Sequence, residues 1–382
     1  MSTGPKRLQL DRARLYDQIR TAHFERAREL EPAAIVYRTK RYDVDEQLTE
    51  GLELVQAGAA TAAMLFARSR ITVLEVNEPL FLASLPRTAL VLAVLRVGAI
   101  FTRRKPVIVT YAIENMSPFR VSGEARARTR LRRRIEAQLA RFVWRRIDRV
   151  AYGTAAARDL YRAILPASSR RAEETFPALP EPCTCDSSPI RRSHRVVFLG
   201  ALNERKGFPL LLDAWPFIRE RDPLAELTIL GKGALEAVAA KAAEADPSIE
   251  LVIDAPRADI HRQLRRGQVL TLPSQRRPDW REQVGLPIVE GLAHGCSIVT
   301  TTETGIAGWL AEHDHLVVDP GCTPAELAAS IVLQLERGTS AQSVLASLPG
   351  EDGRLAADRW MFGAANAAPH PGEPRHAHAP SP

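Results

Sequence analysis

Residues 281–308 read REQVGLPIVEGLAHGCSIVTTTETGIAG, and this stretch combines a helix, a strand and two acids. Apolar residues at helical spacing over 285–295 are followed at once by the β-branched run 297–301, which predicts a helix leading into a strand. Gly285 opens the helix, whose positive dipole end suits an anion or a hydroxyl-rich ligand. Glu282 precedes the helix and Glu290 lies in its second turn, and carboxylates accept hydrogen bonds from sugar hydroxyls. Two acids eight residues apart can equally be exposed surface acids.

The alternation of short apolar runs with helical segments continues on both sides of this stretch. Strands are predicted over 33–38, 71–76, 106–113, 149–153, 195–200, 227–230, 250–254, 269–273, 297–301 and 315–319. Helices are predicted over 46–68, 87–103, 126–149, 154–165, 208–219, 234–245, 285–295 and 324–337. The sequence therefore predicts an α/β protein whose parallel strands are joined by crossover helices in two doubly wound domains facing across a cleft.

Domain boundaries follow from where this alternation stops and restarts. Residues 166–193 contain five prolines and few apolar residues, as interdomain linkers do. The predicted parts are an N-terminal helical extension over 1–32, a first α/β domain over 33–170, a linker over 171–193, a second α/β domain over 194–345 and a C-terminal segment over 346–382. From about residue 364 that segment consists largely of Ala, Pro, His and Gly, and we expect a disordered tail.

Two loops of the second domain have the composition of a phosphate-binding site. After the first strand, the loop GALNERKG (200–207) carries Arg205 and Lys206 into a helix, where cations beside free backbone N–H groups suit a diphosphate. The second strand ends in GKG at Gly231, and glycines let the backbone approach a ligand closely. Both loops could be solvated surface, and neither matches a P-loop or a G-x-G-x-x-G fingerprint.

The order and spacing of these elements resemble the C-terminal, donor-binding domain of the glycosyl transferase group 1 family. The run consists of GALNERKG, about 25 residues to LTILGKG, about 40 residues to VLTLPS, then the two glutamates and TGIAGWLAEHDHLVVDP. It covers residues 195–338 well, and residues 33–165 only as a compatible α/β pattern. The resemblance implies the GT-B fold, with two Rossmann-like domains, and a retaining enzyme that moves a sugar from a nucleotide diphosphate sugar to an acceptor hydroxyl.

Site roles follow from this resemblance position by position. Lys206 would contact the donor diphosphate and Glu282 would face the transferred sugar, which makes them the catalytic candidates. Glu290 would hold the ribose of the nucleotide. The further donor-binding candidates, in the loops and at the helix start, are Gly200, Arg205, Gly231, Ser274, Gly285 and Leu286. No cofactor or metal is implied, because Lys206 and helix N–H groups would stabilise the leaving diphosphate.

The acceptor side and three departures from the family pattern complete this interpretation. Glu114 and Asn115 follow strand 106–113 and are the acceptor-side candidates, although they could equally cap a turn. Ala201 stands where the family usually has an arginine, whose charge Arg205 could supply from four residues away. Val284 replaces the usual phenylalanine and Gly291 the usual alanine. TKRYDVDEQ follows strand 33–38 in place of a glycine-rich loop.

Two other function classes remain open at this point. Ala201 and the altered first loop are compatible with a non-catalytic GT-B scaffold that binds partners or membranes. A sugar-nucleotide epimerase has a similar two-domain shape and needs no acceptor.

Positive charge is concentrated in the first domain. The net charge is +7, but residues 86–171 alone carry +15 and the remainder carries −8. The densest part, residues 126–149, predicts an amphipathic helix with an apolar stripe made of Leu131, Ile135, Leu139, Phe142 and Val143. Such a helix can be an ordinary outer helix, can lie on an anionic membrane surface, or can bind nucleic acid. Nucleic acid is the least favoured partner, because no binding motif accompanies the charge.

Cysteine content and apolar stretches set the expected compartment. Four cysteines are too few for a disulfide scaffold in a chain of 382 residues, and the Cys183-x-Cys185 pair has no second ligand pair nearby in sequence. We therefore expect ordinary thiols, no metal and a reducing cytoplasm. The first 25 residues lack a signal-peptide core, and Arg96 ends the longest apolar stretch, 88–95, so no transmembrane helix is expected. The expected location is cytoplasmic, on the inner face of the membrane if the basic helix binds lipid.

Overall fold

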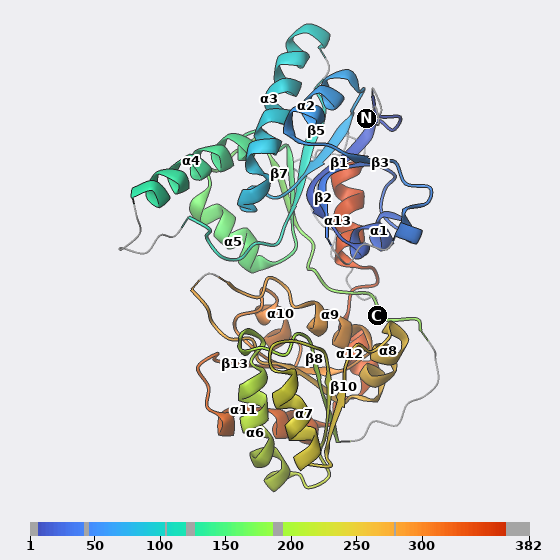
Figure 1. Cartoon of the computed structure of the whole chain (residues 1–382), viewed down its shortest axis with the longest axis vertical. Helices are drawn as coiled ribbons and strands as arrows, with labels where there is room; N and C mark the ends of the chain where they lie inside the picture. Colours follow the sequence, from blue (N-terminus) through green and yellow to red (C-terminus); the bar gives the residue numbers. More distant parts are fainter. Residues whose placement is uncertain are drawn as a thin grey trace, which may run out of the picture.

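The structure, a computed structural model, describes residues 7–41, 46–103, 105–119, 127–185, 194–278 and 280–363. It contains two parallel β-sheets, one in each half of the chain, and each sheet has helices packed against it (Figure 1). The predicted α/β class with two doubly wound domains is confirmed. The expected disordered tail from about residue 364 lies outside the described residues.

The N-terminal sheet has seven strands in the order β3-β2-β1-β4-β5-β6-β7. Their bounds are β1 Arg12–Ile19, β2 Ala34–Lys40, β3 Leu54–Gln56, β4 Val73–Val76, β5 Val107–Ala112, β6 Arg149–Tyr152 and β7 Ala172–Thr175. The connecting helices are α1 Thr21–Ala27, α2 Ala59–Arg68, α3 Leu85–Thr102, α4 Ala127–Trp144 and α5 Ala155–Ile164. The register is parallel throughout, as crossover connections require.

Strand β1 corrects the predicted helical extension over residues 1–32. Arg12–Ile19 lies between β2 and β4, near the middle of the sheet. The sequence RARLYDQI does not read as a buried strand because Arg14 and Asp17 interrupt its apolar residues. Both charged side chains are nevertheless buried, because the fold supplies partners: Asp358 for Arg14 and Arg38 for Asp17.

The C-terminal sheet has six parallel strands in the order β10-β9-β8-β11-β12-β13. Their bounds are β8 Arg195–Leu199, β9 Glu226–Leu230, β10 Ile249–Val252, β11 Val269–Leu272, β12 Ser297–Thr301 and β13 Leu316–Val318. The helices are α6 Phe208–Arg221, α7 Glu236–Ala245, α8 Arg257–Arg266, α9 Leu286–Ala293, α10 Ala307–Glu312, α11 Pro324–Arg337 and α12 Ala341–Ser347. Every strand and helix predicted for this domain is present, and α8, α10 and α12 are additional.

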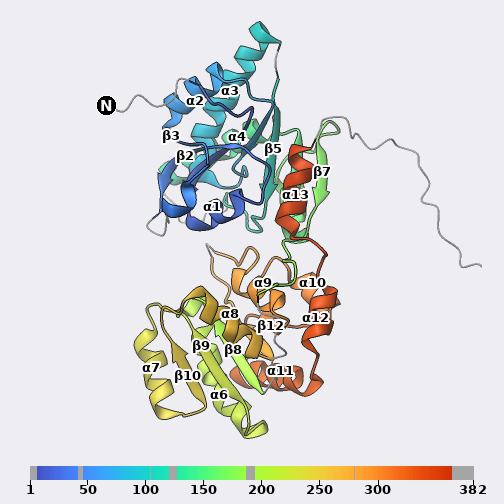
Figure 2. The ribbon, with the colours of Figure 1, turned by 90° about the vertical axis from the view of Figure 1, so that its right-hand side faces the viewer.

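The last described helix returns to the N-terminal domain (Figure 2). Helix α13, Gly353–Phe362, packs Ala357, Met361 and Phe362 against β4, β5 and β6. Strand β7 likewise belongs to the N-terminal sheet, although it lies within the predicted linker 171–193. The two halves of the chain are therefore joined twice, once through residues 176–185 and once through the connection to α13.

Four buried charges hold α13 to the sheet. Arg14 contacts Asp358 at 3.0 Å and Glu75 at 3.5 Å, and Arg354 contacts Glu75 at 2.6 Å and Asp358 at 3.2 Å. All four side chains are buried, and the hydroxyl of Tyr16 donates to Glu75. Because each charge has two opposite partners, the cluster is neutral and its burial is compensated.

The predicted helix over 46–68 is wrong in its first half. A short 3-10 helix, Glu46–Thr49, is followed by strand β3, and only Ala59–Arg68 is helical. Gly51 has φ +80°, a conformation that ends the first turn. Leu54–Gln56 then pair with β2 and do not continue a helix.

Helix α3 has the length and apolar composition of a membrane span over Leu82–Thr102, with a mean hydropathy of 1.6. Its first half packs within the domain, where Leu85, Val91 and Leu92 are buried. Its second half projects from the domain and exposes Ile100 and Phe101 by 74% and 81%. We therefore describe α3 as a domain helix with an exposed apolar end.

Candidate active site

The two domains face each other through the loops at the carboxyl ends of their strands. The side-chain amide of Asn115, which follows β5, donates to the backbone oxygen of Glu282 at 2.8 Å. Beside it, the amide of Gln283 donates to the carboxylate of Glu114 at 2.9 Å. The carboxyl ends of parallel strands are where α/β sheets bind ligands. The acceptor-side candidates Glu114 and Asn115 thus lie directly against a donor-side candidate.

Lys206, Ser274 and Glu282 meet in one cluster of the C-terminal domain. The ammonium group of Lys206 forms an ion pair with the Glu282 carboxylate, to which the Ser274 hydroxyl donates at 3.3 Å. Lys206 ends the 3-10 helix Glu204–Lys206, which Asn203 caps by accepting from the Lys206 N–H. A cation, a hydroxyl and a carboxylate therefore lie together beyond the carboxyl ends of β8 and β11.

Arg205 lies beside this cluster. Its guanidinium stacks on the ring of Trp280 at 4.2 Å, and the Lys206 ammonium lies 5.3 Å from the same ring. Both cations therefore lie near the ring of Trp280, whose electron-rich face attracts them.

Two glycines allow the loops after β8, β9 and β11 to contact one another. At Gly231, with φ +157°, a Cβ would lie 1.9 Å from the backbone oxygen of Gly200. At Gly207, with φ +71°, a Cβ would lie 1.8 Å from the backbone oxygen of Pro273. Larger residues would separate the loops after β8, β9 and β11, so these glycines set the shape of the site.

Helix α9 presents its start and Glu290 to the same domain interface. Gly285, with φ +86°, caps the helix. A Cβ added to Gly285 would lie 3.4 Å from the side chain of Glu282. Leu286 begins the helix with its side chain exposed, and Pro287 has no N–H, so the N–H groups at this end come from Gly285 and Leu286. Burial raises the pKa of Glu290.

Glu290 is separated from the Lys206 cluster. The charges that act on its carboxylate are Arg257 of α8 and Glu25 of α1, which form their own pair at 3.7 Å across the domain interface. The structure brings Lys206, Ser274 and Glu282 into contact, with Asn115 on the Glu282 backbone oxygen and Glu114 on the adjacent Gln283. Glu290 lies further along α9, as expected if it meets a different part of one extended ligand.

One of the family departures, Gly291, has a packing explanation. Gly291 lies on the face of α9 against β11, where a Cβ would approach the side chain of Leu270 to 2.9 Å. Val284 is buried, and its backbone oxygen accepts from the Thr304 hydroxyl at 2.6 Å. Nothing in the structure explains why alanine stands at position 201.

Sequence reasoning missed the acid that holds the loop before Glu282. Glu303 is completely buried and accepts from Arg276 at 3.0 Å and from Arg281 at 3.2 Å. Glu303 lies in TTETG just after β12. The sequence signal that could have identified it is a polar residue directly after a buried strand. By fixing both ends of residues 276–281, Glu303 positions Glu282.

It also missed Glu78, which follows β4 as Glu114 follows β5. The Glu78 carboxylate accepts from the N–H groups of Ile113 and Glu114 and from the Tyr161 hydroxyl, at 2.9–3.1 Å. Burial raises the pKa of Glu78 to about 7. Glu78 lines a cavity of about 260 Å³ with His23 and Arg26, and a second cavity of about 210 Å³ lies between Glu114 and Glu282.

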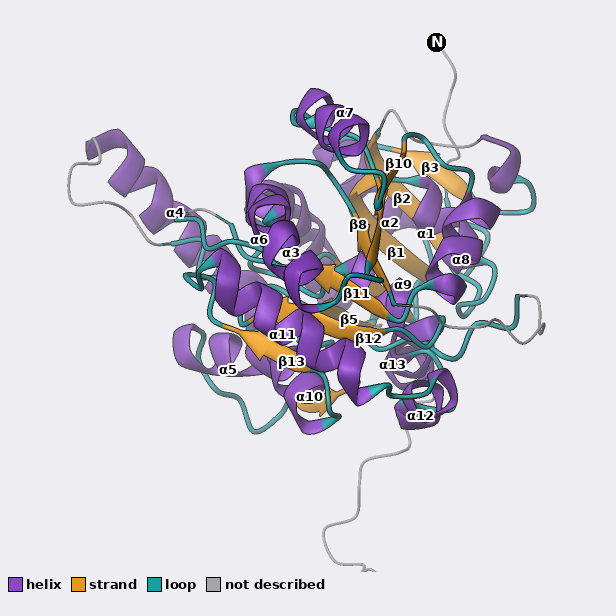
Figure 3. Ribbon diagram, turned by 90° about the horizontal axis from the view of Figure 1, so that it is seen from below, coloured by secondary structure: helices purple, strands orange, loops and turns teal. Residues whose placement is uncertain are grey.

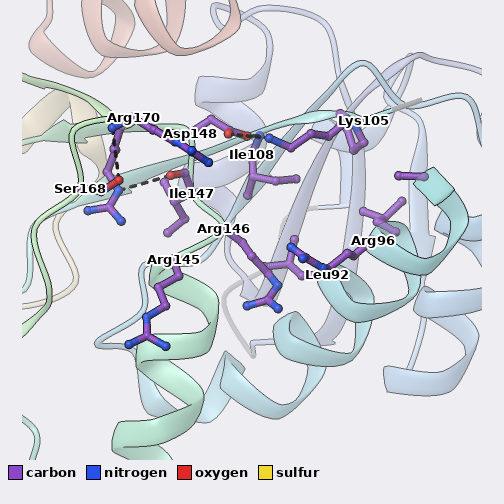
Figure 4. A pocket seen from close by; sticks show the side chains of 14 residues that line it. Leu92, Arg96, Lys105, Ile108, Arg145, Arg146, Ile147, Asp148, Ser168 and Arg170 are labelled. Atoms are coloured by element: carbon purple, nitrogen blue, oxygen red, sulfur yellow. Dashed lines mark hydrogen bonds and ion pairs between the residues drawn. The ribbon is translucent and has the colours of Figure 1, made fainter. Parts of the chain in front are cut away.

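A further cavity of about 300 Å³ lies away from the interface, at the amino ends of β5 and β6 (Figure 4). Its cationic lining residues come from α3, the end of α4 and the loops before β5 and β7: Arg96, Lys105, Arg145, Arg146, Arg170 and Arg171. Asp148 is the one acid among its described lining residues, and it pairs with Lys105 at 3.2 Å. Burial lowers the pKa of Arg146, and the charges of Arg96 and Arg145 lower it further.

Comparison with known proteins identifies the second domain. Residues 193–337 match the family model of glycosyl transferases group 1, which confirms the resemblance read from the sequence for this part of the chain. The amylovoran biosynthesis glycosyltransferase AmsK of Erwinia amylovora is 30% identical over 158 residues, which cover 38% of this chain and 36% of AmsK. The matched region spans about a third of the length of the curated relatives.

Solved structures show the fold over most of the chain. HepE of Anabaena, solved in complex with UDP, superposes with a TM-score of 0.61 at 15% identity over 92% of this chain and 95% of HepE. WaaG, a glycosyltransferase involved in lipopolysaccharide biosynthesis, superposes with a TM-score of 0.54 at 13% identity over 92% of this chain and all of WaaG. The fold is GT-B, as the resemblance implied.

Proposed function

We propose, from a second domain that matches glycosyl transferases group 1 and a chain with the GT-B fold, that this protein is a glycosyltransferase. It moves a sugar from a nucleotide diphosphate sugar to an acceptor hydroxyl with retention of configuration. The observation that carries the proposal is that the cluster of Lys206, Ser274 and Glu282 lies against the N-terminal domain. Asn115 donates to the backbone oxygen of Glu282, and Glu114 accepts from the adjacent Gln283. HepE has been solved with UDP and with UDP-glucose, which supports a donor of this class.

The donor residues act on the bond between the sugar and the diphosphate. This bond breaks, the acceptor oxygen bonds to the same sugar carbon, and the acceptor proton leaves with the phosphate or to water. Negative charge grows on the leaving diphosphate, where Lys206, Arg205 and the N–H groups of Gly285 and Leu286 stabilise it. These cations supply the charge that a metal provides in other transferases. Glu282 faces the sugar and Glu290 binds the ribose.

The acceptor enters from the N-terminal domain. Asn115 is 95% buried and its side-chain oxygen has no hydrogen-bond partner among the described residues, so it can accept from an acceptor hydroxyl. Glu114, whose pKa burial raises, lies next to it. AmsK is named for amylovoran biosynthesis and WaaG for lipopolysaccharide biosynthesis, and we propose a cell-envelope glycan acceptor for this protein.

A thermal-shift panel of nucleotide diphosphate sugars tests the donor assignment. A ligand of the folded state at about 100 times its Kd stabilises it by about 2.7 kcal/mol, so the correct donor should raise the melting temperature measurably. Glu290→Ala should abolish this shift, and Glu312→Ala, an exposed acid on α10, should retain it. No shift with any donor, or an unchanged shift in Glu290→Ala, would contradict the proposed donor site.

We also propose that the protein works as a cytoplasmic enzyme on the inner face of the membrane. The apolar stripe predicted for the basic helix is only half used for packing: Val143 is buried, but Leu131 and Ile135 of α4 are 60% and 53% exposed. Helix α3 adds its exposed apolar end, and the basic cavity between α3 and α4 adds cations (Figure 4). Apolar side chains flanked by arginines fit an anionic lipid surface.

Vesicle flotation tests the membrane proposal. The wild type should float with vesicles that contain anionic phosphatidylglycerol and not with pure phosphatidylcholine. Each basic residue near the surface contributes about 1 kcal/mol, so the double variant Arg141→Glu/Arg145→Glu should bind at least about tenfold more weakly. The control Arg221→Glu/Arg266→Glu changes the same charge at exposed positions of the C-terminal domain and should bind normally. Equal loss in both variants would indicate net charge and not this face.

A further inference from the structure

Four potential metal ligands come together where the linker crosses the C-terminal domain. Cys183, Cys185, His261 and His294 each offer one ligand atom, and these atoms all lie within 4.8 Å of one another. They come from three separate segments: the linker, helix α8 and the residue that follows α9. The linker is fixed there by the Cys183 N–H, which donates to the Ala293 backbone oxygen at 2.8 Å.

We propose that these four side chains form a structural zinc site. Two thiolates and two imidazoles are a ligand set that Zn²⁺ binds tetrahedrally, at about 2.3 Å from sulfur and about 2.0–2.1 Å from nitrogen. Such a site places the ligand atoms about 3.3–3.8 Å apart. The farthest pair must therefore close by about 1 Å, and the two sulfur atoms, now 2.6 Å apart, must open by a similar amount.

His294 is already in the tautomer that binds a metal. The Nδ1 of His294 lies 2.7 Å from the Glu290 backbone oxygen, and since that oxygen can only accept, Nδ1 carries the proton. Nε2 is then the acceptor, and it faces the Cys185 sulfur at 3.4 Å. Metal-binding histidines characteristically donate their other N–H to a carbonyl in this way.

Arg265 holds Cys185 in place beside the histidines. Its guanidinium donates to the Cys185 sulfur at 2.9 Å and to the Cys185 backbone oxygen at 3.0 Å. Zinc binds cysteine as the thiolate. Two thiolates neutralise the charge of Zn²⁺, so the bound site would add no net charge to this half-buried position.

The position of the site suggests what it does. Zinc would tie the linker to the end of α9, the helix whose start and Glu290 face the proposed nucleotide sugar. It would therefore fix this helix relative to the connection between the domains without touching the donor. The inference uses the ligand geometry alone and does not depend on the proposed transferase activity.

Zinc content of the purified full chain, without an added tag, is the direct test. After gel filtration we expect one zinc per chain in the wild type and in Cys322→Ser, a matched thiol elsewhere in the same domain. We expect almost none in Cys185→Ser and in His261→Asn, the latter at a half-exposed position that should not affect folding. Zinc held by His376 and His378 of the tail would remain in all variants and would overturn the proposal.

Chelation and thiol counting separate the alternatives. EDTA should lower the melting temperature of the wild type and Cys322→Ser but not of Cys185→Ser, and added ZnCl₂ should restore it. Cobalt in place of zinc should give a thiolate charge-transfer band that Cys183→Ser lacks. The proposal is overturned if the wild type neither contains nor takes up zinc. It is also overturned if the denatured wild type shows two reactive thiols instead of four, because that result would mean a Cys183–Cys185 disulfide.

Discussion

Lys206→Ala is expected to release nucleotide from the donor sugar about 10²–10³-fold more slowly than the wild type, the usual loss when one group that stabilises transition-state charge is removed. Lys206 is held in place before the donor arrives, because it pairs with Glu282 and lies near the ring of Trp280. A cation already in position needs no reorganisation as charge develops on the diphosphate. The measurement is steady-state release of nucleoside diphosphate with the donor that the thermal-shift panel selects.

Two further variants make this result specific. Lys206→Arg keeps the positive charge and should recover part of the lost rate. Lys241→Ala removes an exposed lysine of α7 and should leave the rate unchanged. Melting temperatures of all variants show whether the loss of the Glu282 partner alters folding. A rate for Lys206→Ala within about threefold of the wild type would mean that Lys206 only pairs with Glu282.

Asp358→Ala should destabilise the N-terminal domain by about 3–5 kcal/mol, the cost of breaking a buried ion pair from one side. Asp358 is 1% exposed and contacts Arg14 and Arg354, and it also accepts from the Glu31 backbone N–H. Without it, two buried guanidinium groups share the single carboxylate of Glu75. The net positive charge then has no compensation, and α13 loses its hold on the sheet.

Scanning calorimetry and urea unfolding check this prediction, with Arg359→Ala as the control. Arg359 is on the same helix and pairs with Glu351, but its side chain is 64% exposed. Exposed pairs contribute about 0–1 kcal/mol, so the control should unfold close to the wild type. If Asp358→Ala and Arg359→Ala lose similar stability, the buried cluster does not anchor α13.

The residues proposed to bind the donor could be chosen from the sequence because their signals are local. Lys206 and Glu282 each lie in a short motif next to a strong strand or helix, and the order of these motifs carries the family resemblance. Glu303 and Glu78 could not be chosen in the same way. A glutamate after a strand is common, and only the contacts with Arg276, Arg281 and Tyr161 distinguish these two.

Two features that the sequence did not reveal, one in each domain, have the same physical origin. Strand β1 contains Arg14, whose partner Asp358 is 344 residues away in the chain, so no local pattern could show that its charge is compensated. The Cys183-x-Cys185 pair seemed to lack further ligands because His294 lies 109 residues from Cys185. Both cases depend on long-range pairing, which hydrophobic periodicity does not record.

Sequence alone therefore determined the alternation of strands and helices in the second domain, the proline-rich break before it and the glycines and cations of its loops. These properties follow from side-chain period and backbone conformation, which are local. Only the tertiary structure decided where β1 and α13 lie, which charges neutralise each other in the interior, and which residues of the two domains meet at the site. A buried polar group is stable only with its partner, and the fold selects that partner from any part of the chain.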